Sequence, residues 1–153
     1  MKDKSHDYFM NLALQEWHKA LSACLPNPPI VCVLVQGGVV VARGFTKQPG
    51  HRHAEASALS KTLGSLSGVV AYVTLEPCSF HGRTASCALA LIECGIKEVY
   101  VAIRDPDIRN RGKGVQLLVN AGVSVTDNIL SDAVSRFLSP YLSTAIDEGS
   151  EQF

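Results

Sequence analysis

The chain has 153 residues, 46% of them hydrophobic, which fits one globular domain with its own core. Its 14 basic and 14 acidic residues balance, so the sequence shows no excess positive charge for a nucleic-acid backbone, and a small-molecule partner is favoured. The apolar runs are too short to cross a bilayer, and the charged N-terminal segment lacks the apolar region of a signal peptide. The five cysteines do not have the spacing of a disulfide framework. These features predict a cytoplasmic protein with reduced thiols and no membrane contact.

The first half of the chain predicts a helix, a hairpin and a second helix. Their expected ranges are residues 7–25, 30–35 with 39–45, and 54–63. Apolar residues recur at helical spacing in the first range until Pro26-Asn27-Pro28-Pro29 stops the helix. Gly37-Gly38 is typical of a tight turn between two β-branched runs, so the first two strands are expected to be antiparallel.

Strands and helices alternate in the second half. The expected strands are residues 69–75, 98–103 and 123–126, and the expected helices are 86–94, 114–121 and a last one capped by Ser131. This alternation predicts an α/β fold: a three-layer helix-sheet-helix sandwich with a five-stranded mixed sheet and sites at the carboxyl ends of its parallel strands. Pro140 is expected to break or restart the last helix. The predicted domain covers residues 1–146, followed by a polar tail, 147–153.

One histidine and two cysteines have the type and setting of zinc ligands. His53 opens the second helix, Cys78 follows the strand 69–75, and Cys87 opens the next helix. Helix starts stabilise thiolates, and three protein ligands leave a fourth tetrahedral position for water. Each residue alone is more often a helix-entrance histidine or a buried cysteine, but together they predict a catalytic Zn²⁺ site.

Glu55, in the sequence His53-Ala54-Glu55, is not needed as a ligand. Its predicted role is proton transfer, from an activated water to a ring nitrogen and then to the departing amine. Together with the ligands, it predicts a hydrolytic zinc deaminase, an aminohydrolase acting on a cyclic amidine. The alternative for Glu55 is an ordinary first-turn glutamate favoured by the helix dipole.

Eight residues separate the two cysteines, where the compact form of the motif is Cys-x-x-Cys. Four stretches carry a likeness to a known family: His53-Ala54-Glu55, Thr74 to Ser79, His81 to Thr84, and Arg104-Asp105-Pro106. They resemble the deaminase half of the riboflavin-pathway deaminase/reductase family. Pro26-Asn27-Pro28 is similar to that family's entrance loop, and the resemblance runs over residues 8–142.

The resemblance implies a cytidine-deaminase-like fold, homo-oligomers, and Zn²⁺ held by His53, Cys78 and Cys87. The family's substrate is a diaminopyrimidinone with a ribosylamino 5′-phosphate. The candidates for contact with it are Asn27, Thr46, Phe80, His81 and Arg83. The guanidinium of Arg83 suits a carbonyl or phosphate oxygen, and the alternative is that Arg83 is a solvated cation in a loop. For Asn27 the alternative is a residue that only forms a turn. Turn chemistry explains Asp105 as well as a contact would.

The chain departs from the family pattern in the substrate-facing loops. Phe80 and Thr46 each stand where the family usually has a histidine. Ala85-Ser86 replaces a double proline, and Asp107-Ile108 replaces Asn-Pro. Losing an imidazole changes which ring edge or ribose a pocket accepts. The substrate is therefore left open between the riboflavin intermediate and a related amino-pyrimidine, nucleobase or nucleoside-like metabolite.

The chain has no room for the family's reductase, so we expect a stand-alone deaminase served by a separate reductase. An excised domain and a relative recruited to another pathway are the alternatives. Two other classes remain open. One is a catalytically inactive zinc-binding regulatory subunit, against which Glu55 argues, and the other is an editor of nucleic-acid bases, against which the balanced charge argues.

Overall fold

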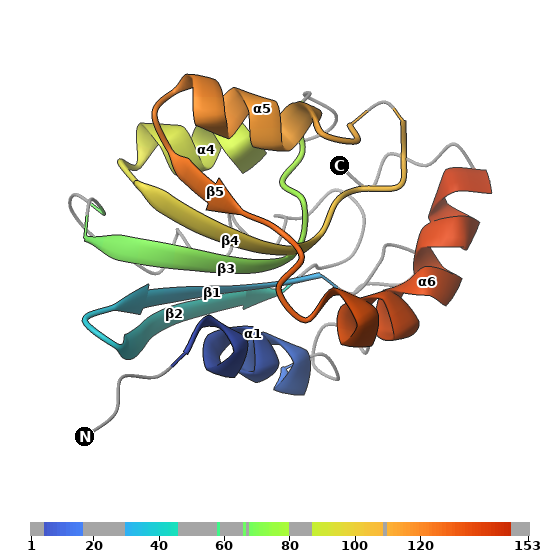
Figure 1. Ribbon diagram of the computed structural model, residues 1–153, viewed down its shortest axis with the longest axis horizontal. Helices are drawn as coiled ribbons and strands as arrows, with labels where there is room; N and C mark the ends of the chain where they lie inside the picture. The colour runs from blue at the N-terminus through green and yellow to red at the C-terminus, as the bar shows by residue number, and fades with distance from the viewer. Residues whose placement is uncertain are drawn as a thin grey trace.

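The computed structural model describes residues 5–16, 30–45, 58, 66, 68–79, 87–108 and 110–147, with 141–147 described for their backbone alone. Their elements are α1 (His6–Gln15), β1 (Val31–Gln36), β2 (Val39–Phe45), β3 (Val69–Leu75), α4 (Cys87–Glu93), β4 (Glu98–Ile103), α5 (Lys113–Asn120), β5 (Ser124–Thr126) and α6 (Ser131–Asp147). Figure 1 shows α4 and α5 on one face of the sheet and α1 on the other, with α6 near the carboxyl ends of β3 and β4. The predicted three-layer α/β fold is confirmed.

The sheet has five strands in the order β2-β1-β3-β4-β5. β1 pairs with β2 and with β3 in antiparallel register, whereas β3, β4 and β5 pair in parallel. The hairpin between β1 and β2 turns at Gly37 and Gly38, whose φ angles of 59° and 80° suit a turn that only glycine adopts at low cost. Both the antiparallel start and the parallel second half follow the sequence prediction.

The core forms where β1 and β3 meet the helices of both outer layers. Five successive residues of β1 are buried, and so is nearly all of β3, which matches strands covered on both faces. α1 contributes Phe9, Met10 and Ala13, and α5 contributes Leu118. The carboxyl ends of β3 and β4 therefore lie at the edge of a densely packed core, which holds the first residues of the following loops in place.

The start of α1 is joined to the sheet through an aromatic cluster. The His6 ring stacks on Tyr100 with 3.9 Å between centroids, and its Nδ1 lies 2.7 Å from the Tyr72 hydroxyl. Burial, with the nearby Glu98 carboxylate, raises the pKa of Tyr72 to about 12. This cluster connects α1 to β3 and β4 on the face opposite α4.

α1 and α6 differ most from the sequence prediction, whereas α4 and α5 begin and end within one residue of their predicted limits. α1 ends at Gln15, and the rest of its predicted range, residues 17–25, lies outside the described residues. α6 begins at Ser131 itself and continues through Pro140 to Asp147, so the expected break is wrong and Asp147 belongs to the helix. An interior proline costs about 3 kcal/mol. Buried Val134 and Leu138 pack the preceding turns onto the core, which outweighs that cost.

Among the described residues, no helix is both long enough and apolar enough to cross a membrane.

Candidate metal centre

The structure brings together the two cysteines predicted as ligands. Cys78 follows β3, and Cys87 is the first residue of α4. The Cys87 backbone N–H donates a hydrogen bond to Cys78 Sγ, with 3.2 Å between nitrogen and sulfur. The N–H of Ala88 donates to the Cys78 carbonyl oxygen at 3.0 Å. Cys78 therefore follows the strand and Cys87 begins the helix, as their positions in the sequence predicted, and the hydrogen bonds bring the two thiols together at the N-terminus of α4.

The surroundings of the two sulfurs suit a bound divalent metal. The side chains of Cys78 and Cys87 are 2% and 3% exposed, and neither is joined in a disulfide. A backbone N–H directed at sulfur favours its deprotonated form, which is the form that binds metal. Soft thiolates select Zn²⁺ over the hard cations. The donor set present here therefore fits zinc.

The remaining predicted site residues lie outside the described residues. These are His53, Glu55, Asn27, Thr46, Phe80, His81 and Arg83. Within the described part of the chain, no three His, Cys, Asp or Glu residues converge as a metal site would require. Ala58, which belongs to the helix predicted to carry His53, is helical and fully buried.

Glu76 organises the backbone around Cys78, although the sequence did not single out this function. Its side chain is 1% exposed, and its carboxylate accepts three backbone N–H groups. The donors are Asp105 and Gly112, each at 3.0 Å, and Val115 at 2.9 Å. An acidic residue between a buried strand and a Pro-Cys pair was the available signal. Glu76 thus ties the end of β3 to the β4–α5 loop and to the start of α5.

α5 packs directly onto this segment at Gly114. A Cβ added there would lie 1.8 Å from the Pro77 carbonyl oxygen and 3.2 Å from Glu76 Cγ. No side chain larger than hydrogen fits at such an approach. The sequence prediction placed the start of a helix at this glycine, whereas the structure shows that it is also the contact point between α5 and the residues preceding Cys78.

Asp105 is nearly inaccessible, and its charge is disfavoured. Burial is the main cause that raises its pKa to about 7, and hydrogen bonds from the Asp107 N–H and the Asn110 side chain oppose the rise. Its Oδ1 accepts the Asp107 N–H at 3.0 Å, which is the side-chain turn that aspartate forms before a proline loop. Of the two roles that the sequence left open for Asp105, the turn is the one observed.

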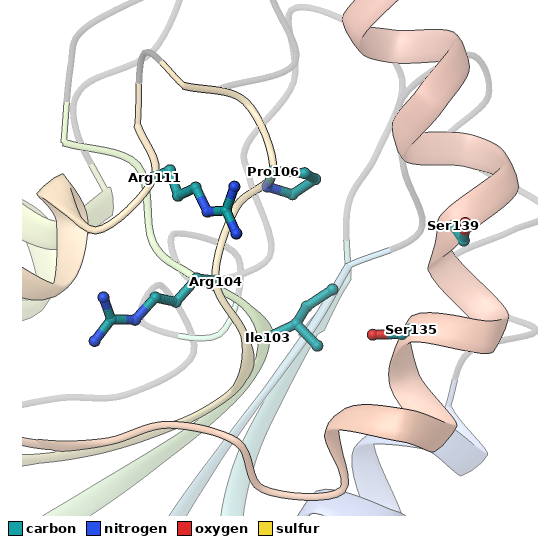
Figure 2. A pocket seen from close by; sticks show the side chains of 6 residues that line it. All are labelled: Ile103, Arg104, Pro106, Arg111, Ser135 and Ser139. Atoms are coloured by element: carbon teal, nitrogen blue, oxygen red, sulfur yellow. The ribbon is translucent and has the colours of Figure 1, made fainter.

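A pocket of about 230 Å³ opens beside the β4–α5 loop, next to α6. Its lining residues are Ile103, Arg104, Pro106, Arg111, Ser135 and Ser139. In Figure 2 the Arg111 side chain extends toward Pro106, while Arg104 extends the other way, in keeping with its ion pair to Asp127 at 2.6 Å. Guanidinium and hydroxyl donors suit an anionic or polar ligand. Arg111 is not one of the site residues predicted from the sequence.

Comparisons with known proteins assign the family. The profile described as "Cytidine and deoxycytidylate deaminase zinc-binding region" matches residues 3–103. The chain is 42% identical to the riboflavin biosynthesis protein RibD of Haemophilus influenzae over 134 residues, which are 88% of this chain and 36% of that protein. It therefore spans about a third of the length of the RibD proteins it matches.

Two further relatives resemble the chain over most of its length. A diaminohydroxyphosphoribosylamino-pyrimidine deaminase of Buchnera aphidicola subsp. Schizaphis graminum is 36% identical over 137 residues, 90% of this chain and 91% of that protein. The structure of Acinetobacter baumannii RibD, form 2, superposes with a TM-score of 0.85 at 38% identity, over 91% of this chain and 39% of that one. The chain belongs to the cytidine and deoxycytidylate deaminase zinc-binding family, and within it to the relatives of the RibD deaminase domain, as its motifs indicated.

Proposed function

We propose that the chain is a zinc-dependent aminohydrolase that removes an exocyclic amine from an amino-pyrimidine of riboflavin biosynthesis, with diaminohydroxyphosphoribosylamino-pyrimidine as the leading substrate. The observation that carries the proposal is the pairing of Cys78 and Cys87 at the start of α4. The choice of substrate is based on the similarity to the Buchnera aphidicola deaminase, since the match covers 90% of this chain and 91% of that protein.

Each predicted residue has a distinct task in this reaction. Zinc, when bound, supplies a Lewis acid that activates water at neutral pH. Cys78 and Cys87 would hold it together with His53. Glu55 would accept one proton from the attacking water and deliver it to a ring nitrogen of the substrate. It would then accept the second proton of that water, from the hydroxyl now bound to the ring carbon, and pass it to the amine as the C–N bond breaks, so that ammonia leaves and a ring carbonyl remains.

The buried surroundings of the two cysteines support this assignment. With both side chains almost fully buried, bulk water is excluded from the sulfur side of the site, and electrostatic interactions there are stronger than in solvent. Asn27, Thr46, Phe80, His81 and Arg83 remain the proposed contacts for the pyrimidine ring and its ribose phosphate.

The test is ammonia release from the diaminopyrimidine phosphate by the wild type and by Glu55→Gln, with zinc content measured in both proteins. Removal of a general acid–base group is expected to slow the reaction by about 10² to 10⁴-fold while zinc remains bound. Glu93→Gln, at the exposed end of α4, is the matched control and should keep full activity.

The outcomes separate the proposal from its alternatives. Equal activity of Glu55→Gln and wild type would remove Glu55 from the mechanism. A zinc-loaded wild type without activity on this substrate or on any of a panel of amino-pyrimidines and pterin-like rings would favour the regulatory subunit.

A further inference from the structure

A single side chain holds the backbone on both sides of Cys78. The Asn110 Nδ2 group donates a hydrogen bond to the Pro77 carbonyl oxygen at 3.2 Å. The Asn110 Oδ1 atom accepts the backbone N–H of Ser79 at 2.9 Å. Asn110 itself is 0% exposed, so water cannot replace either bond at low cost.

The remaining hydrogen of the Asn110 amide is used as well. Nδ2 also donates to Asp105 Oδ2 at 3.2 Å. The amide thus makes two donated bonds and one accepted bond to three different groups. Aspartate has the same shape without the donors, and glutamine has the donors on a longer stem, so asparagine alone among the amino acids provides this set at this length.

The bonds of Asn110 hold polar groups of the backbone on both sides of Cys78. The peptide groups before and after a residue fix its φ and ψ, and these orient the Cα–Cβ bond. α4 contributes separate contacts, because the Cys87 N–H reaches Cys78 Sγ and the Ala88 N–H reaches the Cys78 carbonyl oxygen. Asn110 adds the connection to the β4–α5 loop.

We propose that Asn110 is a positioning residue for the metal ligand Cys78, acting through the backbone of Pro77 and Ser79. The inference rests on the proposed zinc function. Groups that orient a ligand without touching the metal usually change metal affinity or activity by about 10 to 100-fold when they are replaced. Asn110 lies in the β4–α5 loop, 32 residues beyond Cys78 in the sequence, and only the folded chain connects the two.

The test compares Asn110→Asp with Asn120→Asp in the full chain. Asn110→Asp keeps the acceptor for Ser79 but removes both donors, whereas Asn120 is exposed on α5 and bonded only to the exposed Gln116 among the contacts described. The zinc dissociation constant is measured by competition with a chelating dye. The thiolate-to-metal absorption of the cobalt-substituted protein reports the geometry at sulfur directly.

For Asn110→Asp we expect zinc binding weakened by about 10 to 100-fold and a shifted cobalt absorption band. Asn120→Asp should match the wild type in both. Wild-type zinc affinity with an unchanged cobalt spectrum in folded Asn110→Asp would overturn the inference, while absence of zinc from the wild type would instead overturn the proposed function.

A double variant, Asp105→Asn with Asn110→Asp, separates the grip on Cys78 from a general loop contact. It restores a donor and an acceptor between positions 105 and 110 but not the donor to Pro77. Zinc affinity should stay low, and full recovery would show that only the link to position 105 matters, which contradicts the inference. If Asn110→Asp does not fold, hydrogen exchange of zinc-loaded wild type decides: the Ser79 amide should exchange slowly, and rapid exchange would refute the contact.

Discussion

At the scale of single residues, the sulfur atoms of Cys78 and Cys87 differ in their setting from the other described cysteines. Cys94 lies after the end of α4 and is only partly buried, and Cys32 is part of the β1 core. Cys78 and Cys87 are joined by a hydrogen bond from the backbone N–H of Cys87 to the sulfur of Cys78. The two cysteines predicted to bind metal are therefore also a pair whose surroundings stabilise a thiolate.

Replacing either ligand should abolish stoichiometric zinc binding. In Cys78→Ser or Cys87→Ser a soft thiolate becomes a hydroxyl that stays protonated at neutral pH and binds Zn²⁺ poorly. Elemental analysis of purified protein is the measurement. Cys94→Ser is the matched control and should keep about one zinc per chain, as expected for a residue outside the ligand set. The same zinc content in Cys78→Ser and wild type would rule Cys78 out as a ligand.

The buried Asp105 should make stability depend on pH. Because burial raises its folded-state pKa from 3.8 to about 7, the folded chain holds a proton in this pH range that the unfolded chain has released. The free energy of unfolding contributed by this group is therefore greatest at low pH and is lost as pH rises through about 7.

Asp105→Asn removes that dependence. The free energy of unfolding of the variant minus that of the wild type should be larger at pH 8 than at pH 5 by about 1–3 kcal/mol. Urea unfolding of both proteins at the two pH values measures this gain, and any change in hydrogen bonding that does not depend on pH cancels in the comparison. A difference between the proteins that stays constant with pH would show that Asp105 does not titrate in this range.

At the scale of elements, the site depends on how α5 meets the end of β3. The helix approaches so closely at Gly114 that its backbone lies against the Pro77 carbonyl. Glu76 holds the same junction by accepting N–H groups from the loop and from the first turn of α5. The helix N-terminus, whose N–H groups lack partners within the helix, is thus used to fix the segment that carries Cys78.

Gly114→Ala should therefore destabilise the protein, although glycine to alanine inside a helix ordinarily stabilises by about 0.5–1 kcal/mol. The added Cβ would clash with Pro77 and push α5 away from the strand end, at a cost of about 1–3 kcal/mol. Chemical denaturation is the measurement. Gly68→Ala is the control, since its Cβ would meet only Gln36 Nε2 at 3.5 Å, an ordinary contact. A stabilised Gly114→Ala would mean that α5 does not approach Pro77 this closely.

At the scale of the whole molecule, zinc would couple segments that are distant in the sequence. The two proposed ligands Cys78 and Cys87 would join the end of β3 to α4, and His53 would add the helix that contains the buried Ala58. A ligand that binds only the native chain adds its binding free energy to stability, about 2.7 kcal/mol at a hundred times its dissociation constant.

Removing zinc should thus lower the melting temperature. For a chain of this length the loss corresponds to about 5–10 °C, and it should reverse when zinc is returned. Calorimetry of the wild type with and without a chelator measures the shift, and Cys87→Ser should show none. A wild-type melting temperature that does not respond to chelator or zinc would argue against a metal site in the folded chain.

Patterns within short stretches of sequence were sufficient for much of this fold. β2, β3 and β4 have the ranges predicted from β-branched runs and flanking glycines, because a strand's alternation and its turns are written in adjacent residues. The cysteine pair at a strand end and a helix start followed from the same local reading. Helix limits were less predictable, since packing of Val134 and Leu138 carries α6 through a proline that local propensity disfavours.

The tertiary structure alone decided which groups support the site. Glu76 meets partners 29 to 39 residues away, and Asn110 reaches Pro77 across 33 residues. These bonds exist because β3 and β4 pair in parallel, which brings the loops after both strands to the same edge of the sheet. The sequence by itself determined which residue types are candidate ligands and the order of the strands along the chain. Long-range pairing decided the rest, because hydrogen bonds between distant loops leave no periodic signal in either segment.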